Sequence, residues 1–366
     1  MVAGKTILAT RVSDISSRFC MSSLFMLVKP FLSMILLSGI ILIGISGCDT
    51  RFKPDTVLSQ YVSDLNRSQL LSISVPAILM PNGLPALRDR QTPLSTFDIG
   101  LLDFLSLQRC DVGIVAGRKN SILGKVMPDS QRFLYELDII RAIESCDISD
   151  SELSKALNLI AQKKRLELPI AFGNALFSGA ESKVFFSLSN GFLPLDYSTA
   201  DQQVLLSALN RLVSIGEHLN ELPNLNGKAF EADLKALMDS EYAGRLLYTL
   251  AQISRYLATV SKAVSQLDSM ACGASMVYFQ RQFDVNYIKI IQPYMGRVTR
   301  SAYQVLPLLN RLAELSAPLR VNMSTFMNQF SLIEFNSEWL RFQRASQTHA
   351  RHWSELFALC SVPVKG

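Results

Sequence analysis

Apolar side chains recur at intervals of three and four residues along most of this chain, and no alternation of apolar and polar residues lasts longer than a few positions. Intervals of three and four place side chains on one face of an α-helix, whereas strict alternation is typical of a half-buried strand. The clearest series is Leu246, Leu250, Ile253, Leu257, Val260, Val264 and Leu267. The sequence therefore predicts an all-α fold, a bundle of long amphipathic helices with irregular Pro-rich connections.

Prolines and capping residues set the expected limits of the helices. A first helix is predicted over residues 54–65. An irregular strap follows over 71–88, because Pro76, Pro81 and Pro85 cannot continue a regular element. Further helices are predicted over residues 93–110, 129–146, 151–165, 170–187, 200–219, 228–270, 285–315 and 326–360.

Basic and apolar residues within these helices predict two further details. The run Lys163, Lys164 and Arg165 is expected near the end of its helix, where positive charge suits the helix dipole. The apolar series over residues 246–267 is expected to form the seam of an antiparallel helix pair, with the helix after Gln282 as its partner.

The turn at Asn190 and Gly191, followed by Pro194, is the best internal boundary of the chain. It predicts an N-terminal helical lobe with the strap over residues 48–190 and a C-terminal long-helix bundle over 191–366. A chain of this length also permits one large domain, because it lies near the size at which a single core stops growing.

The beginning of the chain has the three parts of a secretory signal. Lys29 precedes an uncharged apolar run over residues 31–45, and small residues then lead to Cys48. The run Ile45-Ser46-Gly47-Cys48 resembles the cleavage motif of bacterial lipoproteins. Residues 1–47 are therefore predicted to be a signal peptide, with acyl chains such as palmitate on Cys48. An uncleaved anchor is the alternative, and the internal methionines Met21 and Met26 offer shorter signals.

Asp49 follows the predicted lipidation site directly. By resemblance to enterobacterial lipoproteins, an aspartate at this position implies retention at the periplasmic face of the inner membrane. The outer membrane is the alternative, because this sorting rule differs among bacteria. The membrane is thus the first expected partner, reached through the N-terminal lipid.

The charge balance argues against a nucleic-acid partner. The residues before Cys48 hold four of the 36 basic side chains and one of the 31 acidic ones, so that the net charge falls from +5 to +2 without them. Binding of nucleic acid needs a clustered excess of Lys and Arg. None is expected here.

Four cysteines follow Cys48, namely Cys110, Cys146, Cys272 and Cys360. An even number of cysteines in an oxidising compartment predicts disulfides, and three pairings are possible. We favour Cys110 with Cys146 and Cys272 with Cys360, because each bridge then staples its own lobe. Four buried thiols are the alternative. A metal site is not expected, because no Cys or His spacing suits tetrahedral ligands.

One polar stretch could bind an anionic group at a short connection before a helix. Its candidate residues are Arg118, Lys119, Asn120, Ser121, Lys125 and Arg132. Backbone N–H groups and the helix dipole would add to the side-chain charges. The structural alternative is favoured, in which Asn120 and Ser121 satisfy the loop backbone and Arg132 pairs with Glu136 one turn later.

Enzyme motifs fail when their chemistry is tested. A phosphate-binding loop is excluded because Val126 replaces the hydroxyl that would hold magnesium. An α/β-hydrolase nucleophile is not expected either, because no Gly-x-Ser-x-Gly turn occurs. His349, His352 and Glu355 could begin a zinc site, but a solvated helix face is favoured. The carboxylates that could pair for glycan hydrolysis, expected instead to be solvated or salt-bridged, are Asp98, Asp103, Glu136 and Asp138. No catalytic residue, metal or cofactor is therefore assigned.

Residues 101–110 and 120–132 resemble the family of bacterial lipoproteins described as domain of unknown function 3080, although Gly117 and Lys119 stand where a more acidic-basic pair is expected. The resemblance implies an envelope lipoprotein and supplies no activity. The chain is expected to be a non-catalytic interaction or structural module with an envelope protein as partner. The alternative is a carrier of a small anionic amphiphile such as a lipid. The oligomeric state stays open.

Overall fold

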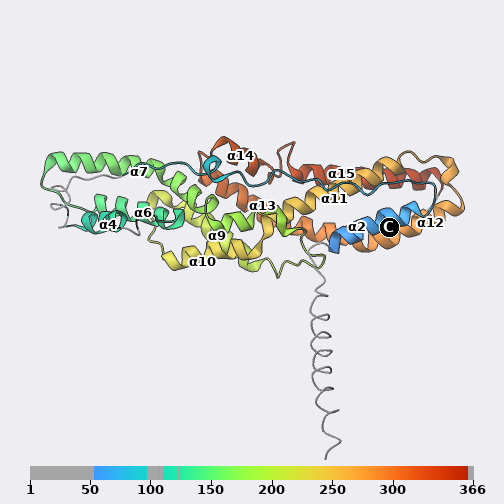
Figure 1. Ribbon diagram of the computed structural model, residues 1–366, viewed down its shortest axis with the longest axis horizontal. Helices are drawn as coiled ribbons and strands as arrows, with labels where there is room; N and C mark the ends of the chain where they lie inside the picture. Colours follow the sequence, from blue (N-terminus) through green and yellow to red (C-terminus); the bar gives the residue numbers. More distant parts are fainter. Residues whose placement is uncertain (1–52, 97–106, 108–109, 122–123, 125, 362–366) are drawn as a thin grey trace, which may run out of the picture. The chain divides into compact units, whose positions relative to one another are not determined.

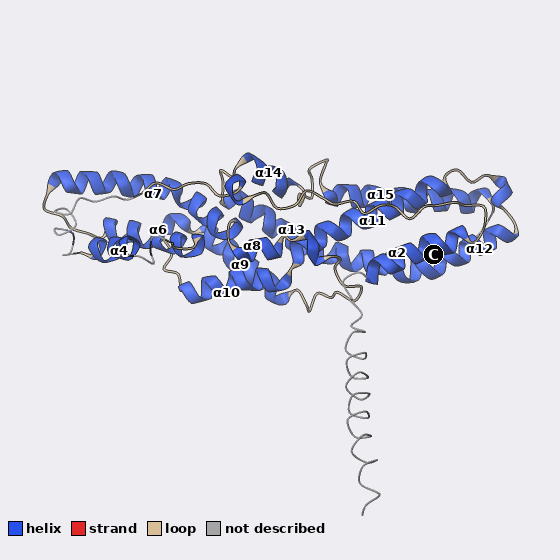
Figure 2. Ribbon diagram, viewed as in Figure 1, coloured by secondary structure: helices blue, strands red, loops and turns tan. Residues whose placement is uncertain are grey.

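The computed structural model describes residues 53–96, 107, 110–121, 124 and 126–361. Helices and loops make up this part of the chain, which contains no strand, as the all-α prediction requires (Figure 2). The described residues belong to one compact unit, Thr50–Gly366. None of the helices among them is long and apolar enough to cross a membrane.

The helices predicted over residues 54–65 and 129–146 are present with limits within two residues of the prediction, whereas the helix over residues 111–120 was not predicted. The strap over residues 71–86 has no regular structure, as its prolines predict. The elements of this half are α2 Lys53–Asn66, η2 Leu87–Asp89, α4 Asp111–Asn120, α6 Asp129–Glu144, α7 Ser151–Phe177, α8 Ala180–Phe185 and η4 Leu188–Asn190 (Figure 1).

The second half contains longer helices. They are α9 Gln203–Glu217, η5 Leu219–Glu221, α10 Gly227–Ser240, α11 Tyr242–Val264, η6 Ser269–Ala271, α12 Ala274–Gln282, η7 Phe283–Ile291, α13 Gln292–Leu315, α14 Val321–Asn328 and α15 Glu338–Leu359. η7 is a π-helix, and α13 has Pro293 in its first turn. The predicted helix over 285–315 is therefore divided where its first proline indicates.

The predicted end of a helix before Pro169 is wrong. α7 continues through Pro169 to Phe177, and Asp150 caps its start by accepting from the backbone N–H groups of Glu152 and Leu153. A proline removes one helical hydrogen bond, but the residues after it, from Ala171 to Phe177, are all buried and keep the helix in place. The basic run at 163–165 consequently lies inside the helix and not at its negative pole.

Two predicted long helices are each two helices. α10 and α11 meet at Glu241, whose φ of 51° ends the first helix in the left-handed region. Close packing follows at once, because a Cβ on Gly244 would lie 2.1 Å from the carbonyl oxygen of Ser187. The predicted helix over 326–360 is likewise divided between α14 and α15, where the Ser337 hydroxyl caps the start of α15.

The apolar series over residues 246–267 forms the seam of a helix pair, but its partner was predicted wrongly. α11 packs most extensively against α15, and the two lie side by side in Figure 1. Every member of the series is buried except Leu267, which is partly buried against the same core. Of the helix predicted after Gln282, η7 packs against α2 and α12, and α13 packs mainly against α9.

Contacts cross the predicted boundary near residue 190. α2 packs against η7, α12 and α11, and α8 packs against α10. The division into two lobes stays a prediction, and the signal peptide over residues 1–47 lies outside the described residues.

Two disulfides are present, Cys110–Cys146 and Cys272–Cys360, and they are the favoured pairing of the three possible ones. The first joins the start of α4 to the end of α6, and the second joins the loop before α12 to the end of α15. Disulfides persist in oxidising compartments. They indicate that this chain folds outside the cytoplasm.

Candidate functional site

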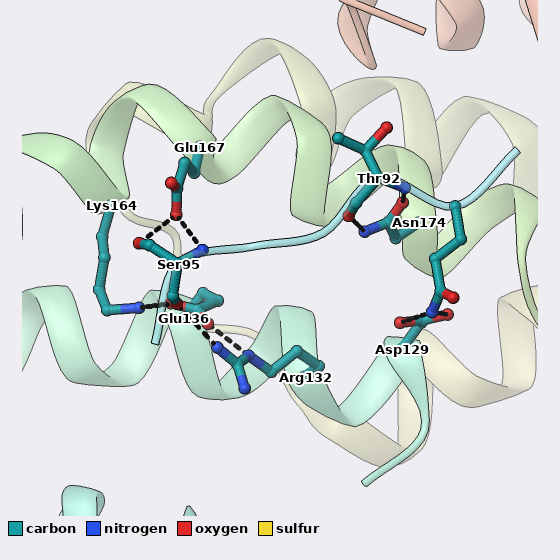
Figure 3. A network of polar contacts seen from close by, with 9 residues as sticks. Thr92, Ser95, Asp129, Arg132, Glu136, Lys164, Glu167 and Asn174 are labelled. Atoms are coloured by element: carbon teal, nitrogen blue, oxygen red, sulfur yellow. Dashed lines mark hydrogen bonds and ion pairs between the residues drawn. The ribbon is translucent and has the colours of Figure 1, made fainter. Parts of the chain in front are cut away.

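The segment over residues 91–95 lies extended between α6 and α7 and is held by side chains of both helices (Figure 3). Asn174 on α7 forms two hydrogen bonds with the backbone of Thr92, at 2.9 and 2.7 Å. Glu167 accepts from both the N–H and the hydroxyl of Ser95, at 3.1 and 2.6 Å. The helix predicted from Pro93 is therefore absent over 93–96, and its remainder lies outside the described residues, apart from residues 107 and 110.

A buried ion-pair cluster lies beneath this segment. Lys164 Nζ is 2.6 Å from Glu136 Oε2, and their side chains are only 1% and 4% exposed. Arg132 donates to the other oxygen of Glu136, as the structural alternative predicts. Both cations also donate to the carbonyl oxygen of Ser95, at 3.4 and 3.3 Å. The cluster thus fixes this segment, which follows the strap and η2 in the chain, to α6 and α7, and we call it the strap clamp.

Three of the six predicted anion-binding residues lie around Tyr135 on α6. Arg118 forms an ion pair of 2.7 Å with Asp138. Lys119 Nζ and the Arg132 guanidinium carbon lie 5.8 and 5.4 Å from the centre of the Tyr135 ring, within cation–π distance.

The other three predicted residues contribute less to this arrangement. Ser121 donates to the Arg118 carbonyl and accepts from the Gly124 N–H, at 2.7 and 3.0 Å, so that it satisfies the loop backbone. Asn120 is the last residue of α4, and Lys125 lies outside the described residues. Binding of an anion by the six stays a prediction.

A pocket of ≈ 330 Å³, which we call the Arg118 pocket, opens beside these cations. Arg118 and Arg141 line it together with Tyr135 and with the apolar side chains of Met127, Leu134, Leu137 and Leu225. The buried Tyr135 hydroxyl has no hydrogen-bond partner among the described residues. Burial and the nearby Glu136 raise the pKa of Tyr135 to about 12, so that the phenol stays a neutral donor. The pocket thus combines two arginines that share Asp138 as their ion partner, an unused phenol donor and an apolar wall.

A second open groove, of ≈ 410 Å³, lies along α12 and η7. Val277 and Ile288 line it, and both are exposed, as are Val285 and Ile290 on the same π-helix. π-Helical segments are rare and occur frequently at functional sites. Sequence reasoning missed this groove, because the residues read as one more amphipathic helix.

His349 is buried and not on a solvated helix face, which corrects the favoured prediction for that residue. Its ring nitrogens lie 3.2 Å from the Tyr61 hydroxyl and 3.1 Å from the Ser261 hydroxyl. His352 is half-buried, with its Nδ1 2.9 Å from the Ser261 carbonyl. In the part of the chain that the structure describes, no group of three His, Cys, Asp or Glu side chains could hold a metal ion.

The remaining candidate residues divide into those with ion partners and those outside the description. Glu136 and Asp138 are in ion pairs, as expected of carboxylates on these helices. Cys48, Asp49, Asp98 and Asp103 lie outside the described residues.

Comparison with known proteins identifies the family and no activity. Neither a curated protein nor a solved structure matches the chain. A family profile described as Protein of unknown function (DUF3080) matches residues 58–364, which is more than half of the chain. The chain therefore belongs to the DUF3080 family of proteins of unknown function.

Proposed function

We propose that this protein is a non-catalytic interaction module of the bacterial cell envelope, attached to the membrane by a lipid on Cys48. The apolar run before Cys48 supports the anchor, and Asp49 supports attachment at the periplasmic face of the inner membrane. The two disulfides agree with that compartment.

The observation that carries the proposal is the exposed apolar groove along α12 and η7. Val277 and Ile288 line it and are 67% and 38% exposed, and the rings of Phe283 and Phe357 complete its apolar lining. Exposed apolar side chains that line a surface groove are typical of contact sites. Arg281 and Asp284 line the same groove and supply a polar rim of both signs.

The partner that suits this groove is an amphipathic helix of another envelope protein. A helix buries apolar side chains at intervals of three and four residues, and an apolar groove with a polar rim accepts such a face. The balanced charges of the rim favour neither a strongly acidic nor a strongly basic partner.

Two valines of matched exposure allow a sharp test in intact cells. Val277 in the groove is 67% exposed, and Val204 on α9 is 68% exposed. A photo-crosslinking amino acid at Ile288 should yield one dominant adduct with an envelope protein. Val277→Asp should abolish this adduct, whereas Val204→Asp should leave it unchanged. An adduct that survives Val277→Asp, or no adduct at all, would refute the role of the groove.

The Arg118 pocket favours a second candidate function, the binding of a small anionic amphiphile. Its arginines suit an anionic head group, and its leucines suit the first carbons of an acyl chain. Dodecyl phosphate is a suitable probe for calorimetry. Arg118→Glu should remove its binding, and Arg351→Glu, at an exposed ion pair on α15, should not. Equal binding by both variants would exclude this function. Arg132 is unsuitable for the test because it belongs to the strap clamp.

A further inference from the structure

A third pocket, of ≈ 390 Å³, lies where the strap passes α14 and the start of α15. Two glutamines fix the strap at this wall. Gln329 forms two hydrogen bonds of 3.0 Å with the backbone of Asn82, and the Gln252 side chain bonds to both backbone groups of Leu79. These hydrogen bonds fix the strap side of the pocket, and the volume of the pocket is within the range of small-molecule sites.

Glu338, in the first turn of α15, lines this pocket with one oxygen unused. Its Oε1 accepts from Arg341 at 2.7 Å, but its buried Oε2 has no hydrogen-bond partner within the described chain. The residue is only 3% exposed. Burial raises the pKa of Glu338, and Arg341 opposes that shift. A carboxylate that is buried and half-paired stabilises an added cation, because the cation supplies the missing donor and charge.

The rest of the lining is polar and carries one further carboxylate. The exposed Glu334 belongs to it, so that the lining holds two carboxylates and a single guanidinium, that of Arg341. The side-chain amides are those of Asn82, Asn328, Gln329 and Asn336, and Thr325 adds a hydroxyl. Amides both donate and accept hydrogen bonds, as the hydroxyl and amide groups of sugars and amino compounds require.

We propose that this pocket binds a small molecule that bears a primary ammonium group together with hydroxyl or amide groups. The ammonium pairs with the unused oxygen of Glu338, and Glu334 supplies the second negative charge. The terminal torsion of a glutamate carboxyl group has a broad range, so that Oε2 can turn toward the pocket while the rest of the Glu338 side chain keeps its position. The amides bind the polar groups of the ligand. This site is independent of the interaction groove on α12 and η7.

Glucosamine and N-acetylglucosamine test the proposal, because acetylation removes the positive charge and keeps the sugar. Calorimetry with the folded protein should give saturable binding of glucosamine and binding at least about ten-fold weaker for N-acetylglucosamine. Glu338→Gln should weaken glucosamine binding by about ten-fold or more. Glu355→Gln, at an exposed position on the same helix, should leave it unchanged.

A second variant separates loss of the site from loss of folding. Glu334 is exposed, so that Glu334→Gln keeps the core intact and should also weaken glucosamine binding. No saturable binding of glucosamine, equal binding of the two sugars, or unchanged binding by both Glu338→Gln and Glu334→Gln would overturn the proposal.

Discussion

His349 should make the folded protein sensitive to mild acid. The imidazole is 0% exposed and lies between the hydroxyls of Tyr61 and Ser261. Burial lowers its pKa from 6.5 to about 3, and the nearby His352 adds to the shift while a backbone hydrogen bond with Leu257 opposes it. The folded state therefore keeps this histidine neutral over the whole range in which an unfolded chain protonates it.

The sign and size of the effect follow from proton linkage. Below a pH of 6.5 the unfolded chain binds a proton at this residue that the folded chain does not bind, so that acid favours unfolding. The contribution is fully present above that pH and is lost progressively as the pH falls toward about 3. At 1.36 kcal/mol for each pH unit, a drop to about pH 4.5 removes about 2.7 kcal/mol of unfolding free energy through this residue alone.

Urea unfolding at about pH 7 and about pH 4.5 measures this contribution. Other groups also titrate in this range, so that His349→Gln is compared with the unmodified protein at both pH values. The variant should lose about 2–3 kcal/mol less than the unmodified protein between them. His352→Gln, which changes a half-buried neighbour, should keep most of the pH dependence. If His349→Gln and the unmodified protein lose equal free energy, the neutral buried histidine is not the cause.

Three further predictions concern stability. Lys164→Met should lower the free energy of unfolding by about 3–5 kcal/mol, because it leaves Glu136 buried with one cation fewer. The double variant with Glu136→Gln should lose clearly less than the sum of the two single variants, and urea unfolding measures all three. Gly244→Ala should lower the melting temperature, because its Cβ would meet the Ser187 carbonyl, whereas Gly296→Ala, with nothing within 4 Å, should not; equal effects would contradict the close approach. In the chain-entropy model, removing Cys272–Cys360, with a sequence separation of 88, should lower the free energy of unfolding by about 4.6 kcal/mol, and removing Cys110–Cys146, with a separation of 36, by about 3.8 kcal/mol. Chemical unfolding of the two double-serine variants tests this order.

Helix periodicity was enough to predict the fold class and most helices, because apolar spacing follows directly from helix geometry. The breaks between helices depend on tertiary contacts and were harder to predict from the sequence. Nothing local requires Glu241 to adopt a left-handed conformation, and the approach of Gly244 to Ser187 is visible only after folding. Pro169 led to the opposite error, a predicted helix end that is absent, since burial of the residues after it outweighs one lost hydrogen bond.

The strap clamp left a signal in the sequence that was overlooked. Lys164 continues the buried face formed by Leu157, Ala161 and Leu168, so that a charged residue stands at an apolar position. Charges are rarely buried without a partner, and the pattern therefore indicates an internal ion pair. The carboxylate that completes it could not be identified in this way, because partners on different helices are brought together only by packing.

The half-paired state of Glu338 could not be anticipated at all. In the sequence it is an acidic residue after a serine, which is typical of a helix start. It lines a pocket together with strap residues that are far away in the chain. The Arg118 region was recognisable because its cations are close in sequence, but its apolar wall includes Leu225 from the other half of the chain.

The strap and the segment 91–95 that follows it are held through backbone hydrogen bonds, in addition to the buried side chains of Leu71 and Ile73. Amides of Gln252, Gln329 and Asn174 bond to the N–H and C=O groups of Leu79, Asn82 and Thr92. Such bonds recognise the path of the chain and not the identity of its residues. The exposed strap positions are therefore natural places for grafting an epitope, a fluorophore or a purification handle, while the three amides that grip it should be left untouched.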